Sequence, residues 1–431
     1  MIGVVLVLLV LGSEGSSFNL SEDPLKLFEQ FKQEYKREYL NAAEELRRKA
    51  VFIKNVETMR EHNAKGSSYR MGINKFADME DSELLAASSR IQNNRRMGAK
   101  RIQEMIKMEK VSPTKQTLKQ AVPANYTLCT SAAEYNYCGT NNINQNTCGG
   151  CYAVGPAQHL STIYAYLTKQ ANNDKPKRKL LSAQQLLDCN TVAWGGCGGG
   201  FAEDVLNSIN GIYYADDYPF IDADKDCEDP EDCEKFKHEC KSLEVEYPLK
   251  FATENKFTHF DNKNWEEIKE IIYKYHGFIS AMKVTSSLYR YEGGIYKSES
   301  CTGQITDHVI TVDGYGECDG HKFLWVRNSW GNDWGIENGH FKIDWNTLCG
   351  INGVDVFRNG NSLQNNLYVE MELGDGDIAE YNPEDGAGDD NEDPIGCTIV
   401  PSSGDPSNGP DDNKTTGVVM VLFIFLMIFF I

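Results

Sequence analysis

Residues 144–154 read Asn-Gln-Asn-Thr-Cys-Gly-Gly-Cys-Tyr-Ala-Val, and they form a pattern with Asp-His-Val-Ile at 307–310 and Val-Arg-Asn-Ser-Trp-Gly at 326–331. The two glycines before Cys151 allow a tight turn. The apolar residues from Cys151 to Thr168 recur at the spacing of a helix. Cys151 is therefore predicted to lie at a helix N-terminus, where the helix dipole favours a thiolate.

The other two segments are predicted to be strands that bring an imidazole and a carboxamide towards the thiol. His308 begins an alternating apolar run, and Asn328 follows another such run. A thiol with a base within reach and donors for an oxyanion is the arrangement of a nucleophilic enzyme. Cys148 and Cys151 could instead form a redox pair or half of a zinc site, but no second closely spaced Cys/His pair completes a zinc set.

At these segments the sequence resembles the papain-like cysteine peptidases, from about residue 25 to residue 359. The resemblance implies a two-lobed α+β fold, with a helical lobe, a lobe of antiparallel β-barrel strands and a cleft between them. It implies that Cys151 is the nucleophile, that His308 is the general base and that Asn328 orients the imidazole. It also implies that the Gln145 side chain donates a hydrogen bond in the oxyanion hole.

The same resemblance implies a peptide-binding surface and no cofactor or metal. Gly199 and Gly200 would let a substrate backbone lie close to the enzyme, because a Cβ there would obstruct it. Phe201 would form the wall and Val354 the floor of a pocket for bulky apolar side chains. Trp330 would shield the bond between histidine and asparagine from water. Proteins and peptides are the expected substrates, and the protein is expected to be a monomer.

Residues 16–87 are predicted to form a helical prodomain. Apolar residues recur at helical spacing at Leu25, Phe28, Phe31 and Tyr35. One face of a second helix carries Glu44, Arg48, Phe52, Asn55, Met59 and Asn63, and a turn follows with Gly72, Asn74, Phe76 and Asp78. Both patterns resemble the inhibitory propeptides of the same family. The prodomain should therefore cover the cleft, and acid should loosen it by protonating carboxylates such as Glu44 and Asp78.

Composition divides the rest of the chain into five parts. An apolar run marks residues 1–15 as a signal peptide, and residues 88–121, with nine basic and two acidic residues between 88 and 120, form a basic processing linker. The peptidase domain is expected at 122–360. An acidic disordered stalk at 361–416 and a hydrophobic tail at 417–431 follow. The tail is either a signal for a glycolipid anchor or a short membrane span, and both readings stay open.

The net charge of −20 lies mostly in the stalk, which has fourteen acidic residues and no basic one between Glu370 and Asp412. Without them the chain has 49 acidic against 43 basic residues, so nucleic acid is not an expected partner. The alternative function is that of a pseudoenzyme that acts as a surface binding protein. The presence of all four proposed catalytic residues, Cys151, His308, Asn328 and Gln145, argues against it.

The thirteen cysteines fit an oxidising compartment, either the cell surface or a lysosome-like vesicle reached through the secretory pathway. Asn125 and Asn413 are glycosylation acceptors in that setting. The family framework implies the disulfides Cys148–Cys197, Cys189–Cys227 and Cys301–Cys349. Proximity in sequence alone suggests Cys129–Cys138 and Cys233–Cys240, and it leaves Cys318 and Cys397 without partners.

Overall fold

The computed structural model describes nine segments of the chain: residues 18–88, 122–129, 136–139, 142–168, 179–191, 196–221, 238–252, 255–356 and 362–373. The predictions for the signal peptide, for Asn413, for Cys227, Cys233 and Cys397, and for the tail lie outside these segments, as do those for most of the linker and the stalk. Within the described segments, no helix is both long enough and apolar enough to cross a bilayer.

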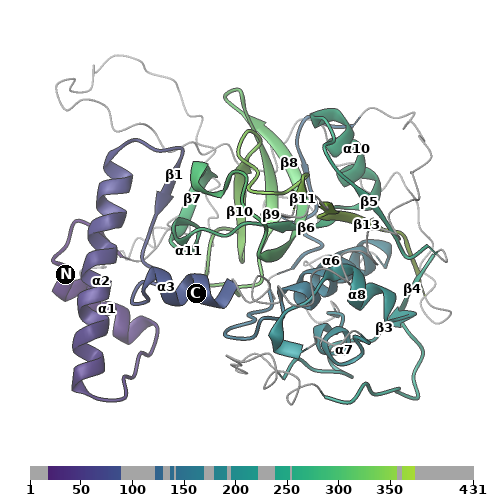
Figure 1. Ribbon diagram of the computed structural model, residues 1–431, viewed down its shortest axis with the longest axis horizontal. Helices are drawn as coiled ribbons and strands as arrows, with labels where there is room; N and C mark the ends of the chain where they lie inside the picture. Colours follow the sequence, from purple (N-terminus) through teal and green to yellow (C-terminus); the bar gives the residue numbers. More distant parts are fainter. Residues whose placement is uncertain are drawn as a thin grey trace, which may run out of the picture.

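The prodomain contains α1 (Pro24–Glu34), α2 (Ala42–Ala64), β1 (Tyr69–Met71) and α3 (Asp81–Ser88). Asp23 and Asn41 begin the two longer helices, because their side-chain oxygens accept hydrogen bonds from free backbone N–H groups of the first turn. Phe28 and Phe31 are buried as the periodicity predicts, whereas Leu25 is 53% exposed. The helices form one side of the molecule in Figure 1.

The predicted face of α2 holds the segment that follows it. The Asn55 side chain donates hydrogen bonds to the carbonyls of Ala77 and Met79, at 2.9 and 3.0 Å. The Asn63 amide exchanges two hydrogen bonds with the backbone of Met71, at 2.8 and 2.9 Å. Polar residues on a helix face therefore fix the path of the chain towards the next domain.

The helical lobe is built around α6 (Cys151–Leu167), which is buried from residue 151 to residue 165. Two short α-helices, a 3₁₀ helix and a small antiparallel sheet surround it: α7 (Ala183–Asp188), η3 (Gly196–Gly198), α8 (Ala202–Asn207), β3 (Gly211–Ile212), β4 (Leu249–Phe251) and β14 (Met371–Leu373). A helix that is buried on all sides lies at the centre of a domain. The predicted helix after residue 150 is thus confirmed.

The second lobe is a sheet of nine strands among the described residues, in the order β1-β7-β10-β9-β8-β6-β13-β5, with β2 on β8. The strands after β1 are β2 (Tyr126–Thr127), β5 (Phe257–Phe260), β6 (Phe278–Met282), β7 (Tyr291–Tyr296), β8 (His308–Cys318), β9 (His321–Arg327), β10 (His340–Asp344) and β13 (Asn366–Val369). Outside this sheet lie α10 (Trp265–Tyr275), α11 (Ser286–Tyr289), η4 (Glu299–Cys301), β11 (Val354–Val356) and β12 (Ser362–Gln364). This is the predicted two-lobed α+β architecture.

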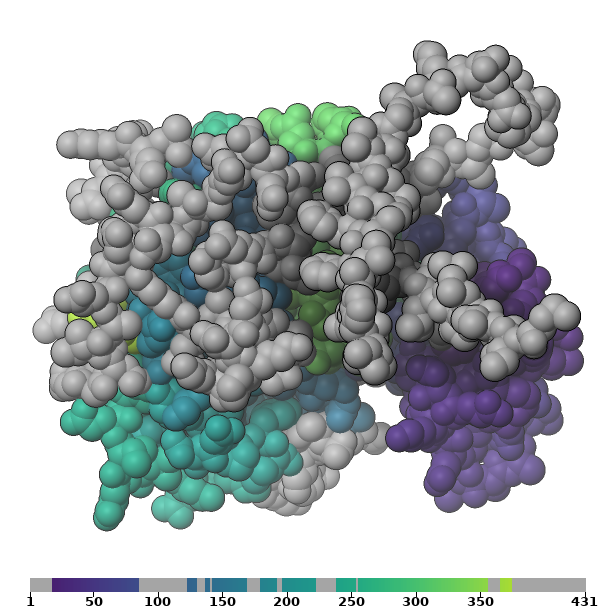
Figure 2. Space-filling view, turned by 180° about the vertical axis from the view of Figure 1, so that it is seen from behind, coloured from purple at the N-terminus to yellow at the C-terminus, as the bar shows by residue number. Residues whose placement is uncertain are grey.

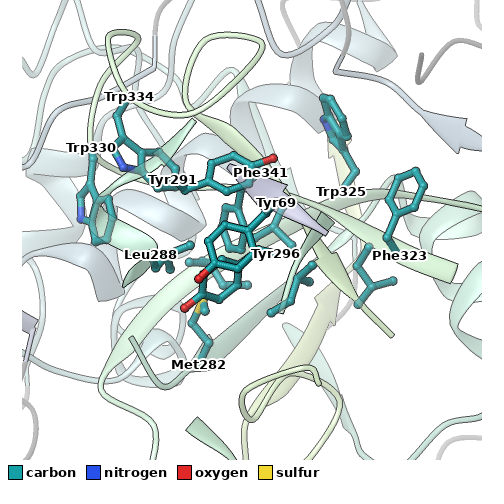
Figure 3. Close-up of a cluster of buried hydrophobic side chains, with 14 of the residues drawn as sticks. Tyr69, Met282, Leu288, Tyr291, Tyr296, Phe323, Trp325, Trp330, Trp334 and Phe341 are labelled. Atoms are coloured by element: carbon teal, nitrogen blue, oxygen red, sulfur yellow. The ribbon is translucent and has the colours of Figure 1, made fainter. Parts of the chain in front are cut away.

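The prodomain adds the edge strand of this sheet, because β1 pairs antiparallel with β7. Tyr69 of β1 enters the aromatic core of the second lobe, with its ring centroid 4.9 Å from that of Tyr296 and 6.5 Å from that of Tyr291 (Figure 3). Seen from behind in Figure 2, the prodomain and the helical lobe lie on opposite sides of the molecule. The prodomain therefore contacts mainly the β lobe.

The predicted boundary at residues 360 and 361 is wrong. Asn366–Val369 is buried between β5 and β6, and Met371–Leu373 pairs with β4. Apolar residues alternate along the segment as in a strand, at Leu367, Val369, Met371 and Leu373. The acidic residues Glu370 and Glu372 lie between them, and for this reason the sequence analysis places the segment in the acidic stalk. The domain that was expected to end at residue 360 continues at least to Leu373.

Two of the predicted disulfide pairings are also wrong. The structure contains Cys148–Cys197, Cys301–Cys349 and Cys129–Cys138, as expected. Cys189 is bonded to Cys240 instead of Cys227, so Cys240 is not available to Cys233. The Cα atoms of this pair are 4.6 Å apart although 51 residues separate them, a closeness that sequence spacing does not reveal. Cys318, for which the sequence analysis suggests no partner, is disulfide-bonded as well.

Candidate active site

Three elements bring the candidate residues to one edge of the β lobe. His308 is the first residue of β8, and Asn328 follows the last residue of β9. These strands are antiparallel neighbours, with Thr311 opposite Arg327, so both side chains lie at the same end of the sheet. The Thr311 hydroxyl donates to the Gly155 carbonyl at 3.1 Å and joins α6, whose first residue is Cys151, to β8.

The hydrogen bond between His308 and Asn328 fixes which imidazole nitrogen carries the proton. His308 Nε2 lies 2.7 Å from Asn328 Oδ1. The same oxygen accepts the Ser329 N–H at 2.9 Å, which identifies it as the acceptor end of the amide. Nε2 must then donate, so the neutral ring keeps its lone pair on Nδ1. His308 is thereby prepared to accept a proton through Nδ1.

Cys151 is the free cysteine among the described residues, and it is 4% exposed. Burial raises the pKa of the Cys151 thiol to about 11, against an opposing hydrogen bond with the Val309 backbone. Burial also lowers the pKa of His308 to about 4, although its bond to Asn328 raises it. In the form that retains the prodomain, both groups are therefore neutral at pH 7.

Hydrogen bonds fix the side chain of Gln145 and use only one of its two amide N–H groups. Its Oε1 accepts the hydroxyl of Ser329, and its Nε2 donates to the Cys148 carbonyl at 2.8 Å. Its backbone N–H donates to the Ser329 carbonyl at 2.9 Å. Since Nε2 carries two hydrogens, the second can serve an oxygen placed near the N-terminus of α6.

Trp330 lies against His308, with the ring centroids 5.4 Å apart. It also stacks on Tyr289 at 4.3 Å and meets Trp334 edge-on at 4.8 Å. Only 5% of Trp330 is exposed. The imidazole therefore lies beside a buried aromatic group.

The glycines of the predicted peptide-binding surface have an internal reason for being glycine. An ideal Cβ on Gly200 would lie 2.6 Å from the ring of Tyr152, and Gly199 has φ +97°. Both positions therefore require glycine even without a substrate. Phe201 precedes α8 and Val354 begins β11, and both side chains are partly exposed.

The prodomain contacts the residues around Trp330 directly. Phe76 meets the rings of Trp330 and Tyr289 edge-on, with centroids 5.5 and 5.1 Å away. Lys75 donates to the Trp330 carbonyl, and its Nζ lies 2.7 Å from Asp333 Oδ1. The turn pattern predicted Phe76, but no sequence signal marked the role of Lys75.

Arg290, just before β7, is a second contact that the sequence did not reveal. Its guanidinium donates to Asn55 Oδ1 at 2.9 Å and to Asp81 Oδ1 at 2.7 Å, both in the prodomain. Arg290 is 3% exposed. An arginine in a run of aromatic and polar residues forms no recognisable motif, so only the structure identifies its partners.

Neither metal nor redox chemistry fits the cysteines of the described residues. Cys148 is bonded to Cys197, so it does not pair with Cys151. In those segments, ligand types converge at Cys129, Cys138, Asp313 and His340. The two sulfurs form a disulfide, and the Asp313 carboxylate is paired with Arg327.

Known proteins resemble both halves of this chain. Residues 131–358 match the papain family cysteine protease domain, and residues 28–84 match the cathepsin propeptide inhibitor domain. A cathepsin L-like proteinase of Phaedon cochleariae is 30% identical over 340 residues, which cover 76% of this chain and 91% of that protein. Cathepsin S of Bos taurus is 28% identical over 337 residues, which cover 74% and 88%.

Solved structures show the same architecture. Digestive procathepsin L2 proteinase from the midgut of Tenebrio molitor larvae aligns with a TM-score of 0.60 at 25% identity, over 77% of this chain and 98% of that one. Digestive procathepsin L 3 from the same source also gives 0.60, at 22% identity, over 80% and 99%.

Proposed function

Because this chain belongs to the papain family of cysteine proteases and is made as a zymogen with an inhibitory propeptide, we propose that it hydrolyses peptide bonds in proteins with Cys151, His308 and Asn328. Cys151 is the nucleophile, His308 is the general base and then the general acid, and Asn328 orients the imidazole. The observation that carries the proposal is the hydrogen bond of His308 Nε2 to Asn328 Oδ1, which leaves Nδ1 free to accept the thiol proton.

In the first half of the reaction the Cys151 sulfur bonds to the carbonyl carbon of the substrate, and the thiol proton passes to His308. The carbonyl electron pair moves to the oxygen, which becomes an oxyanion. When this intermediate collapses, the C–N bond breaks and His308 gives its proton to the leaving amine. The product is a thioester on Cys151 and a free amine.

In the second half, water attacks the thioester and gives a proton to His308. The C–S bond breaks, the peptide leaves as a carboxylic acid, and the thiol regains its proton. The oxyanion of each half accepts hydrogen bonds from the Cys151 backbone N–H and from the spare N–H of Gln145. Two observations support this role, the position of Cys151 in the first turn of α6 and the orientation of the Gln145 amide.

Substrate side chains are proposed to enter a pocket between Phe201 and Val354, with the peptide backbone along Gly199 and Gly200. Both side chains that line this pocket are apolar and partly exposed, which favours bulky apolar side chains in the substrate. Replacement of Val354 by Glu should reverse this preference towards basic side chains, which a peptide library would show.

The active-site assignment is tested in the enzyme after removal of the prodomain. The Cys151→Ala variant should lose peptide hydrolysis and labelling by an epoxide directed at reactive thiols, with an unchanged melting temperature. The Asn328→Ala variant should keep labelling and lose roughly 10- to 100-fold in kcat, since the imidazole still meets the thiol part of the time. Wild-type turnover in the Cys151→Ala variant would refute the assignment. A folded wild type that neither turns over nor labels would favour the pseudoenzyme.

The proposed location is a secretory compartment with oxidising conditions. Among the described cysteines all but Cys151 are disulfide-bonded, and such bonds persist outside the cytosol. Asn125 is proposed to carry a glycan. Its Oδ1 accepts the Glu317 N–H at 2.8 Å, and this bond leaves Nδ2 for attachment.

Attachment to a membrane through residues 417–431 is a separate proposal. The run is apolar but short, since fifteen helical residues span roughly 22 Å of a hydrocarbon core about 30 Å thick. A phospholipase specific for glycolipid anchors should release the enzyme from intact cells. Retention, together with peptides that reach Ile431 in mass spectrometry, would indicate a short span instead.

A further inference from the structure

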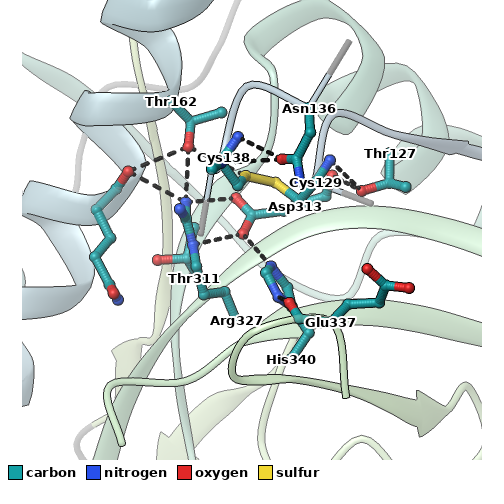
Figure 4. Close-up of a disulfide and its surroundings, with 12 residues drawn as sticks. Thr127, Cys129, Asn136, Cys138, Thr162, Thr311, Asp313, Arg327, Glu337 and His340 are labelled. Carbon is teal, nitrogen blue, oxygen red and sulfur yellow. Dashed lines mark hydrogen bonds and ion pairs between the residues drawn. A yellow bond between two sulfur atoms is a disulfide. The ribbon is translucent and has the colours of Figure 1, made fainter. Parts of the chain in front are cut away.

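A buried ion pair connects the three elements that carry the proposed catalytic residues. Arg327 Nε lies 2.9 Å from Asp313 Oδ2, and the two side chains are 3% and 0% exposed. Arg327 ends β9 directly before Asn328, and Asp313 lies in β8 five residues after His308. Figure 4 shows this pair at the centre of a polar cluster beside the disulfide Cys129–Cys138.

Asp313 faces Arg327 because β8 contains a bulge at this position. Val312 lies opposite Val326 and Gly314 lies opposite Trp325, so Asp313 is an extra residue in the ladder. A bulge turns the extra residue away from the regular alternation of side chains. The Thr127 hydroxyl donates to the Asp313 carbonyl at 3.1 Å and stabilises the irregular backbone.

The guanidinium also reaches α6, the helix that begins with Cys151. Its Nη2 donates to the Gln158 carbonyl at 3.1 Å and to the Thr162 hydroxyl at 2.9 Å. The Gln158 side chain donates in turn to the Asn328 carbonyl at 3.3 Å and accepts the Ile143 N–H at 3.1 Å. The helix is therefore tied to two consecutive residues of the chain, Arg327 and Asn328.

His340 closes the cluster on its far side. Its Nδ1 must donate to the Glu337 carbonyl, 2.6 Å away, so Nε2 faces Asp313 Oδ2 at 3.7 Å. Although burial raises the pKa of Asp313, the charge of Arg327 and the contact with His340 hold that pKa below its usual range. The carboxylate is thus ionised, and its charge is balanced by the guanidinium.

We propose that Arg327 and Gln158, with Asp313, are positioning residues that set the place of Asn328 and His308 relative to Cys151. A buried ion pair is weak evidence for stability, because apolar side chains of similar volume often stabilise a fold as well. Apolar side chains, however, cannot form hydrogen bonds, whose directionality fixes the relative orientation of the elements that they join. The fork of Arg327 links β8, β9 and α6 through bonds of defined geometry, so the pair specifies how three elements meet beneath the site.

The inference rests on the proposed catalytic roles and predicts a loss of turnover without a loss of folding. The double variant Asp313→Leu with Arg327→Met removes both charges, so that no unpaired charge stays buried. Its kcat should fall roughly 10- to 100-fold, as expected for a displacement of about 1 Å, while KM changes less than about twofold. The pH profile for Cys151 alkylation by iodoacetamide should also change, because a displaced His308 accepts the thiol proton less readily.

A second pair of variants keeps the test decisive if the double variant does not fold. Gln158→Met removes the bond to the Asn328 carbonyl. The matched control is Gln185→Met, because Gln185 is an equally buried glutamine that bridges a helix to Gly211 and Tyr213 in the helical lobe. Both should lower the melting temperature to a similar extent, and only Gln158→Met should lower kcat and alter the alkylation profile.

The outcomes separate the two proposals. An active wild type whose folded Gln158→Met and double variants retain its kcat and alkylation profile would overturn the positioning role alone. A wild type with no turnover that depends on Cys151 would overturn the proposed function instead. Rescue of kcat in an Arg327→Lys variant to within about threefold would show that charge, rather than the fork geometry, is sufficient and would contradict the inference.

Discussion

His159 is a buried histidine that none of the proposed catalytic steps uses. It lies on α6 with no exposed surface, and neither ring nitrogen has a hydrogen-bond partner among the described residues. Burial lowers its pKa to about 4, although the Asp313 charge raises it. Because the unfolded chain keeps a pKa near 6.5, the folded state loses stability as pH falls from about 6.5 towards 4.

A His159→Leu variant should therefore be more resistant to acid. Urea unfolding at pH 4.5 should show a gain of about 2 kcal/mol over the wild type, with little difference at pH 7. A His321→Leu variant is the control, because His321 is exposed. An equal gain at both pH values would mean that packing, rather than titration, is responsible.

Cys151 should react slowly while the prodomain is in place. With a thiol pKa raised to about 11 by burial, the thiolate is scarce at pH 7. Alkylation by iodoacetamide should be about 100-fold slower in the precursor than in the processed enzyme, as mass spectrometry of the labelled chain would show. Equal rates would contradict the neutral pair of Cys151 and His308.

At the level of elements, the sequence predicted what depends on local pattern. The helix from Cys151 and the strands at His308 and before Asn328 follow from periodicity, which is a property of neighbours in the chain. The strands β13 and β14 and the disulfide Cys189–Cys240 depend on pairing with residues more than 50 positions away. Glu370, just before β14, and Glu372 within it alternate with the apolar residues and concealed the apolar face of this strand.

In the candidate site, too, the residues that belong to short motifs could be predicted from the sequence, and those that depend on distant partners could not. Short motifs predicted Cys151, His308, Asn328 and Gln145 as a group, and the structure brings their elements together. Arg290 was missed because its partners belong to the prodomain, and nothing near it in the sequence marks it.

The ion pair between Asp81 of α3 and Arg290, the residue between α11 and β7, tests how the prodomain is held. Its charge is buried, and the Asp81 carboxylate is the partner charge, 2.7 Å away. An Asp81→Asn variant leaves this cation without a counterion, while the peptidase domain is unchanged. The residual activity of the unprocessed precursor should rise about tenfold, measured with a fluorogenic peptide. A Glu57→Gln variant, which breaks a surface pair with Arg60, should leave it unchanged.

At the scale of the whole molecule, two carboxylates of the prodomain, Glu44 and Asp81, resist mild acid. Hydrogen bonds from Arg47 and Arg48 lower the pKa of Glu44 to about 2. The pKa of Asp81 is also lowered, because Arg290 outweighs the effect of burial. Lowered carboxylate pKa values give stability that is complete above the ordinary pKa near 4 and is lost only below it. Protonation of Glu44, which the sequence analysis expects to loosen the prodomain, therefore requires stronger acid than the ordinary pKa would.

His62 acts in the opposite direction, because burial lowers its pKa and the prodomain loses some stability below about pH 6.5. The destabilising effect of this one half-buried histidine is set against several stabilising contacts of the prodomain. These are the pairing of β1 with β7, the packing of Tyr69 and Phe76, and the ion pairs of Lys75 and Arg290. The larger set of contacts should dominate. The prodomain should thus stay bound at pH 5 and dissociate below about pH 4, where the carboxylates take up protons.

The Cys151→Ala precursor allows a direct measurement, because it cannot process itself under the proposed mechanism. Trypsin at pH 7.5 should cut the basic segment 88–121, and gel filtration at pH 7, 5 and 3.5 then shows whether the prodomain travels with the peptidase domain. Co-elution at pH 5 and separation at pH 3.5 are expected. An Asp81→Asn precursor should separate at a higher pH, since one of the acid-resistant ion pairs is missing. Complete separation of the unmodified pair at pH 5 would show that His62, or a group outside the described residues, controls release.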